Sequence, residues 1–286
     1  GIRVNLHRAF VVGAMVCCFG CGQLPAPPNM GQSNAVPTSP TPSSQQSSGG
    51  SSAPTPPVVT QPVPVQRSAA EVLAEFQRKP LNDRNDVDLK QLASLGSGVE
   101  PITVLELSGS QVTDAGVSHL SGIKSLRTLD LTNTLVTTEC LQHVAQLQDL
   151  EILKLETARI DAASIGTAAL QQLKPLTQLK ELNLRGTVID ERVFEVLREH
   201  ELLEVLNVSA TKIRGEGFAQ LQDFRRLRVF VASSTQVSDD ALRLWKGSKI
   251  LEVLDLGFTL ITDKGVVLLK SFPNLKVLAL TQCGIS

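Results

Sequence analysis

Apolar residues recur along this chain in a fixed triplet, which is clearest at Leu126, Leu129 and Leu131. Eight such triplets follow one another, and their first positions are Ile102, Leu126, Leu150, Leu179, Leu203, Leu227, Leu251 and Leu275. Successive first positions lie 24 residues apart, except for one step of 29 residues from Leu150 to Leu179. Self-similarity at a fixed period of this length predicts a solenoid built from one repeated unit.

Within each repeat, the pattern predicts a strand, a turn and a helix. Side chains alternate between the two faces of a strand, so the last two triplet residues should enter the core. One residue in each repeat is expected to begin the helix, and six of the seven side chains there can accept a hydrogen bond from a free helix N–H. These residues are Thr113, Thr137, Asp161, Asp190, Arg214, Ser238 and Thr262. The sequence therefore predicts a parallel sheet on the inside and helices on the outside.

Two segments resemble the I-T-D-x-G-L motif of a known family. They are Val112-Thr113-Asp114-Ala115-Gly116-Val117 and Ile261-Thr262-Asp263-Lys264-Gly265-Val266. The motif is similar to that of the cysteine-containing and ribonuclease-inhibitor-like leucine-rich repeats, and the 24-residue period is closer to repeat proteins of bacterial lipoproteins. The resemblance implies an α/β leucine-rich repeat solenoid over residues 102–286, with a curved parallel sheet on a concave face, helices on a convex face, and eight repeats of which the last is incomplete.

A column of small polar residues follows the strands. It comprises Ser110, Thr134, Ala158, Thr187, Thr211, Thr235, Thr259 and Cys283. We expect their hydroxyl groups to bond the backbone of the neighbouring turn, because turn groups otherwise lack partners. The five extra residues of the third repeat fall within about 162–170, at the entry to its helix.

Residues 68–101 are predicted to form a helical N-terminal cap. Ser68 and Glu71 have the spacing of a capping box, and Pro80 should end the helix that they begin. A second helix is expected from about Asp88 to Leu95. Terminal segments of a solenoid must cover the apolar side of the adjoining repeat, and this segment is placed to do so.

The first 67 residues differ sharply from the rest of the chain. Residues 1–21 have a basic start and a short apolar run that ends in a lipobox-like Gly20-Cys21, which predicts a signal peptide with lipid attachment at Cys21. Residues 22–67 are rich in Pro, Ser and Thr, which predicts a disordered linker. The predicted location is the bacterial cell envelope, lipid-anchored to a membrane on its periplasmic or cell-surface side; plain secretion is the alternative.

Composition narrows the possible functions. Residues 68–286 hold 24 basic and 28 acidic side chains, which argues against bulk electrostatic binding to nucleic acid. Aromatic residues make up only 3% of the chain, so an aliphatic core is expected. No phosphate loop, nucleophile elbow or zinc-protease motif is present, so we predict no enzymatic activity, no cofactor and no small-molecule substrate.

The spacing of the cysteines and histidines predicts neither a disulfide nor a metal site. Cys140 and Cys283 should lie about 29 Å apart at the strand spacing of a parallel sheet, too far for a disulfide. His119, His143 and Cys140 should share the convex surface, but they lack a fourth metal ligand of suitable spacing. We therefore predict no metal site and place these side chains on a solvated helix surface.

The expected working surface is the concave face, whose outward columns are polar in repeats one to four and more apolar in repeats five to eight. A partner protein is predicted to bind there. The side chains expected to contact it are Glu106, Asp130, Lys154, Glu156, Asn183, Arg185, Asn207 and Asp255. The alternative is a structural envelope component that self-associates through an open C-terminal edge exposing Leu278 and Leu280.

Overall fold

The computed structural model describes residues 68–95, 100–156 and 171–286. The chain divides into two units, Gly1–Gln61 and Pro62–Ser286, and every described residue lies in the second. The predicted signal peptide with Cys21, the predicted linker and the third-repeat insertion therefore lie outside the described residues.

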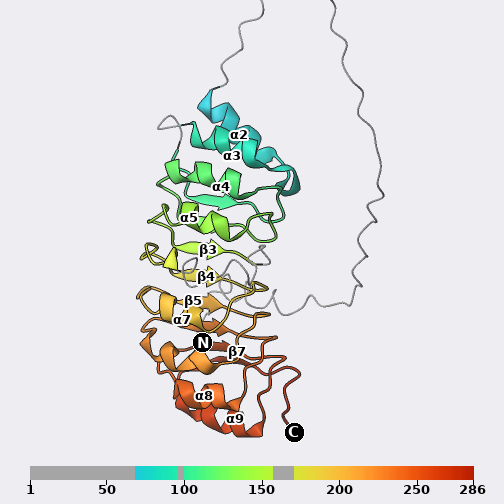
Figure 1. The fold of residues 1–286 in the computed structure, drawn as a ribbon, viewed down its shortest axis with the longest axis vertical. Coiled ribbons are helices and arrows are strands. Elements are labelled where there is room, and N and C mark those ends of the chain that lie inside the picture. Colours follow the sequence, from blue (N-terminus) through green and yellow to red (C-terminus); the bar gives the residue numbers. More distant parts are fainter. Residues whose placement is uncertain (1–67, 96–99, 157–170) are drawn as a thin grey trace, which may run out of the picture. The chain divides into compact units, whose positions relative to one another are not determined.

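One parallel sheet runs through the described repeats, with its strands in chain order (Figure 1). Equivalent residues pair from strand to strand, as in the register of Leu105 with Leu129 and of Leu129 with Leu153. The strands are β1 Val104–Glu106, β2 Thr128–Asp130, β3 Ile152–Lys154, β4 Glu181–Asn183, β5 Val205–Asn207, β6 Val229–Val231, β7 Val253–Asp255 and β8 Val277–Ala279. This architecture confirms the predicted α/β solenoid.

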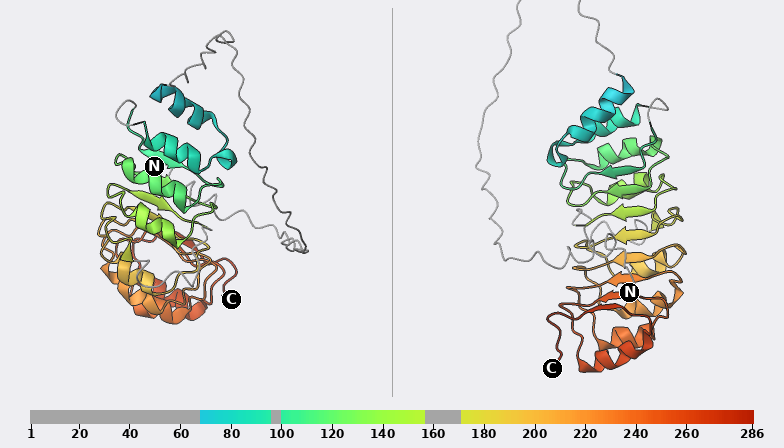
Figure 2. Two further views of the ribbon diagram at one scale, coloured as in Figure 1. Left: turned by 45° about the horizontal axis from the view of Figure 1, so that its top comes forward. Right: turned by 180° about the vertical axis from the view of Figure 1, so that it is seen from behind.

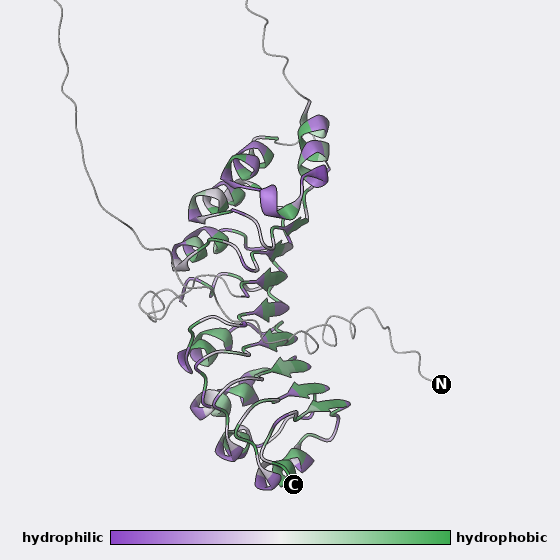
Figure 3. Ribbon diagram, turned by 90° about the vertical axis from the view of Figure 1, so that its right-hand side faces the viewer, coloured by the Kyte–Doolittle hydropathy of each residue, from purple (hydrophilic) through white to green (hydrophobic). Residues whose placement is uncertain are grey.

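Short helices cover one side of this sheet, and the strands form the other side (Figures 2 and 3). The helices of the repeats are α4 Asp114–His119, α5 Leu141–Val144, α7 Arg192–Leu197, α8 Asp239–Trp245 and α9 Asp263–Leu268. Turns of 3₁₀-helix extend or replace them, namely η3 Leu120–Gly122, η4 Thr138–Cys140, η5 Glu216–Asp223 and η6 Leu269–Ser271.

The core lies between the strands and these helices, and its composition differs along the sheet. The last two residues of each triplet are buried as predicted in the repeats of β1 to β7, for example Leu129 and Leu131 at 0% exposure. The expectation of an aliphatic core is wrong for the later repeats, where aromatic rings contact one another edge to face with centroids 5.0–5.8 Å apart. The contacting rings are Phe194, Phe218, Phe230, Trp245 and Phe272.

After every strand except β3, whose turn is not described, the turn contains a left-handed residue that the sequence pattern did not reveal. Only Gly109 and Gly186 are glycines there; the others are Asn133, Ala210, Ser234, Phe258 and Gln282, with φ between 52° and 57°. This conformation directs the residue's N–H to the next repeat, as when Ala210 N donates to Ser233 O at 2.9 Å. A hydrogen bond between repeats thus offsets the conformational strain of a non-glycine residue at positive φ.

The polar column behind the strands bonds differently from the prediction. Thr134, Thr187, Thr211, Thr235 and Thr259 each donate their hydroxyl to the carbonyl three residues earlier in the same repeat, at 2.5–2.8 Å. The predicted bond to a neighbouring turn occurs only at the last position, where Cys283 Sγ lies 3.2 Å from Leu256 O. The hydroxyl group therefore closes its own turn.

At several helix starts a carboxylate holds the following repeat. Asp239 accepts the N–H of Thr262 at 2.9 Å and its hydroxyl at 2.6 Å, and Asp114 does the same for Thr137. Thr137 and Thr262 in turn cap their own helices through their hydroxyl oxygens, as predicted. Ser238 makes no such side-chain bond, so the capping prediction is wrong there.

These carboxylates explain the glycine of the repeat motif. A Cβ atom added to Gly265 would lie 2.3 Å from Asp239 Oδ1, and one added to Gly116 would lie 2.2 Å from Asp86 Oδ1. The reverse arrangement occurs once: Gly215 stands at the carboxylate position, and Ala241 fills the glycine position of the next repeat, with its Cβ 2.2 Å from where a Gly215 Cβ would be. The two positions therefore complement each other at these joints, whereas the joint of Asp114 has Cys140 at the glycine position.

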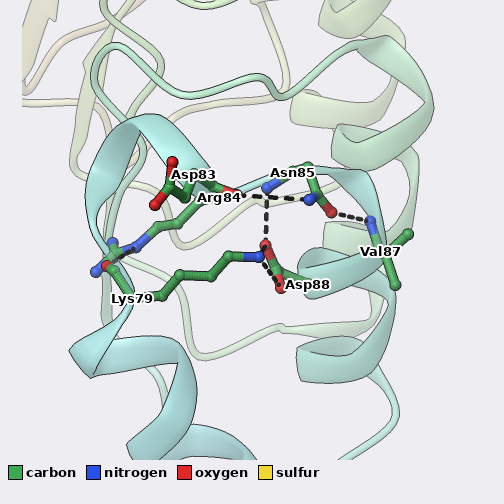
Figure 4. Close-up of polar contacts among 6 residues, drawn as sticks. All are labelled: Lys79, Asp83, Arg84, Asn85, Val87 and Asp88. Carbon is green, nitrogen blue, oxygen red and sulfur yellow. Dashed lines mark hydrogen bonds and ion pairs between the residues drawn. The ribbon is translucent and has the colours of Figure 1, made fainter.

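The N-terminal cap joins the first repeat through the same interaction. It contains α2 Ala69–Arg78, η1 Leu81–Asp83 and α3 Asp86–Ala93. Asp86 accepts the N–H and hydroxyl of Thr113 at 2.8 and 2.6 Å, as a preceding repeat would. The capping box at Ser68 is present, whereas the second helix begins two residues earlier than predicted, because Asn85 caps it (Figure 4).

Within the cap, charged side chains fix the two helices to each other and to the sheet. Lys79 bonds both carboxylate oxygens of Asp88 at 2.7 and 2.9 Å (Figure 4). Arg84 stacks on the Phe76 ring and donates to Glu106 O at 2.6 Å. At the other end, Leu278 of β8 is 41% exposed, whereas Leu254 at the equivalent position of β7 is fully buried.

We expect Asp239→Ala to lower the free energy of unfolding by about 2 kcal/mol, because it leaves the Thr262 N–H and hydroxyl without their charged acceptor. Gly265→Ala should also destabilise the chain, since its Cβ would meet Asp239 Oδ1. The double variant should lose less than the sum of the two, because the Asp239 Oδ1 atom that the added Cβ would meet is then absent. Urea unfolding of the four proteins measures this coupling.

Asp240→Ala is the matched control, because Asp240 lies beside Asp239 in α8 and its side chain pairs only with the exposed Arg243. Its effect should stay below about 0.5 kcal/mol. Strictly additive losses in the double variant would contradict the proposed complementarity.

Candidate protein-binding face

The concave face consists of the outward-pointing side chains of β1–β8 and of the residue two positions beyond each strand. Because the strands pair in register, Glu106, Asp130, Lys154, Asn183 and Asn207 lie side by side in one row. Val231, Asp255 and Ala279 continue that row to β8. The structure thus places the predicted partner-binding residues on one face of the sheet.

Five of these residues form a charged network over β2–β4. Arg185 Nη1 lies 2.5 Å from Glu156 Oε1, and Asn183 Nδ2 donates to Glu156 Oε2 at 3.2 Å. Lys154 Nζ lies 3.6 Å from Asp130 Oδ2. The side chains of Asp130 and Glu156 are only 15% and 16% exposed. The network contains equal numbers of positive and negative charges, so it favours a polar partner surface over a strongly charged one.

Four of the predicted residues also hold the turn that follows their strand. A side-chain oxygen of Asp130, Asn183, Asn207 or Asp255 accepts the N–H two residues later, at 2.9–3.0 Å. Short Asp and Asn side chains favour this local bond, and their recurrence immediately before a turn was a usable sequence signal. These side chains therefore have a structural role whether or not a partner contacts them.

Exposure along the row differs from the expectation of an outward, solvated column. Glu106 is exposed, but Asn183, Asn207 and Asp255 retain only 6%, 5% and 8% of their accessible surface. The prediction of exposure is wrong for these three, because the side chains fold onto their own turns instead of extending into solvent. Glu106, Lys154 and Arg185 are the better-placed members of the predicted set for a direct contact.

Apolar side chains dominate the same face beyond β4. Val205, Val229 and Val253 pair in register and are partly buried, and Val231 lies in the adjacent row. Val277 continues the first row and is 50% exposed. The face therefore passes from a charged network to an apolar strip, as predicted.

A second charged row, which the sequence analysis missed, precedes the strands. It alternates in sign along the sheet: Arg127, Glu151, Lys180, Glu204, Arg228, Glu252 and Lys276. Glu252 is held by Arg228 at 2.6 Å and Lys276 at 3.0 Å, and Glu151 is held by Lys180 at 2.6 Å and Arg127 at 3.0 Å. Alternation at the repeat period was the available signal.

The ion pairs shift the pKa of both carboxyl groups. Hydrogen bonds from Lys276 and then Arg228 lower the pKa of Glu252, and the hydrogen bond from Lys180 makes the largest contribution to the lowered pKa of Glu151. Each carboxylate bridges two cations from the neighbouring repeats on either side. The row thus ties consecutive strands together by charge.

The cysteine and histidine side chains are placed as follows. Cys140 is fully buried, which corrects its assignment to a solvated surface, and burial together with Asp114 raises the pKa of its thiol. His200 is buried with Nε2 2.9 Å from Leu173 O. Among the described residues, no group of three or more His, Cys, Asp or Glu side chains could hold a metal ion, and no helix is long and apolar enough to span a membrane.

We expect Glu252→Gln to destabilise the protein at neutral pH by less than about 1 kcal/mol, because the pairs are partly exposed. The folded state lowers the pKa of Glu252, so its stabilisation is present above the unfolded pKa, near 4.5, and is lost as the pH falls through the folded pKa. Urea unfolding at neutral pH and at about pH 3 should therefore show a difference between variant and parent that becomes smaller in acid. Glu201→Gln is the control, since Glu201 forms no ion pair with a described residue; an unchanged difference in acid would contradict the assignment.

Comparison with known proteins agrees with this geometry. The leucine-rich repeat family model matches residues 100–121 and 247–270. No curated protein sequence matches the chain. The solved structure of internalin C2 from Listeria monocytogenes is similar, with a TM-score of 0.51 and 20% identity over 75% of this chain and 92% of that one.

Two larger proteins contain a similar arrangement. The TLR13–ssRNA13 complex has a TM-score of 0.51 and 20% identity over 71% of this chain, and a TDR receptor has 0.50 and 16% over 73%. This chain spans only 31% and 36% of their respective lengths. At these identities the similarity concerns the fold, and with the two matched repeats it shows that the described residues form a leucine-rich repeat solenoid.

Proposed function

We propose that this chain is a non-enzymatic interaction module that binds a partner protein through its concave face. The change of character along the registered rows carries the proposal: a balanced charged network over β2–β4 is followed by an apolar strip over β5–β8. A polar end can fix the register of a bound protein, while an apolar end supplies buried area.

The charge balance supports a protein over a nucleic acid as the partner. The concave network has as many carboxylates as cations, whereas a nucleic-acid surface needs an excess of Lys and Arg. The solved TLR13 complex contains single-stranded RNA, but that finding concerns TLR13. The low aromatic content leaves few stacking platforms for bases on this chain.

We further propose that the solenoid belongs to the cysteine-containing, ribonuclease-inhibitor-like type and to the bacterial lipoprotein setting. The pairing of a carboxylate with the glycine of the next I-T-D-x-G motif supports the first assignment. The lipobox-like Gly20-Cys21 after an apolar run supports a lipid anchor in the cell envelope. The Pro/Ser-rich residues 22–67 would then hold the repeats away from the membrane.

The concave face is tested by affinity capture from an envelope extract of the source cells. We expect the variant with Lys154→Glu and Arg185→Glu to lose most of the captured partner. Both attractive ion pairs of the network then become repulsive pairs of carboxylates. Arg198→Glu combined with Lys270→Glu, on the helix side, makes the same change in net charge and should retain it. Circular dichroism establishes that both variants are folded.

Equal capture by the two double variants would contradict the concave-face proposal. Assembly of the parent that grows with its concentration in sedimentation velocity, without any captured partner, would support the alternative of a self-associating structural component.

The lipid anchor is tested by metabolic labelling with a radioactive fatty acid in a bacterial host. The parent should incorporate label and fractionate with membranes, because the Cys21 thiol would carry the diacylglycerol. Cys21→Ser should lose both properties, whereas the control Cys18→Ser should keep them. Label that remains on the Cys21→Ser protein would contradict the assignment.

A further inference from the structure

A second surface lies along the side of the sheet where the strands begin. An open hollow of about 510 Å³ there is lined by Glu204, Arg225, Arg226, Arg228, Lys249, Ile250, Glu252, Asn274 and Lys276. These residues belong to four consecutive segments that lead into β5, β6, β7 and β8. The hollow is therefore built by repetition, one segment from each repeat, and is separate from the concave face.

The lining carries five cations and two carboxylates, although the chain as a whole has a net charge of −1. Arg228 and Lys276 are both ion-paired with Glu252, which bridges them. Arg225, Arg226 and Lys249 form no ion pair with any residue in the described ranges 68–95, 100–156 and 171–286. The lining thus has three more cations than carboxylates, and a bound anion would supply the missing negative charge.

Several polar groups of this hollow are already paired within the protein. Glu204 O accepts the N–H groups of Arg228 and Val229, and Arg228 O accepts those of Glu252 and Val253. Asn274 Nδ2 is committed to Lys249 O. Recognition would therefore come from the guanidinium and ammonium groups, and guanidinium forks match carboxylates in a bidentate manner.

The remaining lining residues indicate what kind of anion fits. Glu204 and Glu252 alternate with the cations, so the hollow favours a short anionic segment over a long, uniformly charged polyanion. No aromatic side chain lines the hollow for base stacking, whereas Ile250 is 37% exposed and offers an apolar contact. Residues 1–67 contain no Asp or Glu, so the chain's own N-terminal segment cannot supply the charge.

We propose that the hollow formed by Arg225, Arg226 and Lys249 binds an acidic peptide segment of a protein partner. The cations stand on the segments that lead into β6, β7 and β8. Neighbouring strands lie about 4.8 Å apart, so these three segments span about 10 Å, the length of three or four extended residues. The ligand is thus a short run of Asp or Glu that includes an apolar residue for Ile250. This surface is independent of the charged network on the concave face.

The test uses the full chain and a fluorescein-labelled peptide of about eight residues, Asp and Glu with one central Leu, followed by fluorescence anisotropy. Arg225→Glu, Arg226→Glu and Lys249→Glu together should weaken binding by about tenfold or more, because three favourable pairs become repulsive. The parent affinity should also fall as salt rises from about 0.02 M to about 0.15 M.

The matched control is Lys212→Glu, Lys264→Glu and Lys270→Glu, three exposed cations elsewhere on the solenoid with the same change in net charge. It should bind within about twofold to threefold of the parent, as should the concave variant with Lys154→Glu and Arg185→Glu. Circular dichroism verifies that each variant is folded.

Equal binding by the parent and the hollow variant, or no binding by the parent, would overturn the proposal. So would equal weakening by the control variant, which would indicate net charge alone. A thymidine oligonucleotide of the same charge that binds the parent more tightly than the peptide would also overturn it, in favour of a nucleic-acid surface.

Discussion

Each repeat of this protein is completed by the next one, and the carboxylate at the helix start is the clearest form of that dependence. Asp239 binds the N–H and hydroxyl of Thr262, and the same residue fixes which side chain can occupy position 265. The joint therefore couples helix capping, repeat register and side-chain size in one contact. Because a single 24-residue unit cannot bury its apolar face alone, the stability of the sheet depends on such joints being satisfied from the N-terminal cap onward.

Three faces of the solenoid arise from this repetition and differ in what they can bind. The helix side carries the joints. The concave face carries a neutral charged network and an apolar strip, and the side where the strands begin carries alternating ion pairs that end in an uncompensated basic hollow. A protein partner could contact the second and third faces together, since both are presented by the same strands. The fold supplies the spacing, and the residues outside the core supply the specificity.

The sequence predicted the strands, their order and the buried triplets, because period and apolar pattern directly reflect burial. It did not predict the left-handed residue of each turn, since Ala210 and Phe258 carry no signal of positive φ, nor the aromatic cluster, since a low aromatic content says nothing about clustering. Asn207 and Asp255 were assigned to a partner surface because they are polar on an outward column, yet their oxygens accept hydrogen bonds from their own turns. Contacts between repeats lie 22–29 residues apart and cannot be read from one repeat in isolation.

Two kinds of joint occur in this chain: Gly215 fits beside Ala241, and Asp239 fits beside Gly265. This difference restricts how such a repeat array can evolve. Duplicating or deleting a whole repeat brings new neighbours together at a joint, and not every pair fits. An alanine at position 265 would meet the Asp239 carboxylate, whereas Ala241 fits beside Gly215 and Cys140 follows Asp114. Repeats are thus not freely interchangeable, and recombination within this array is restricted to exchanges that carry both halves of a joint.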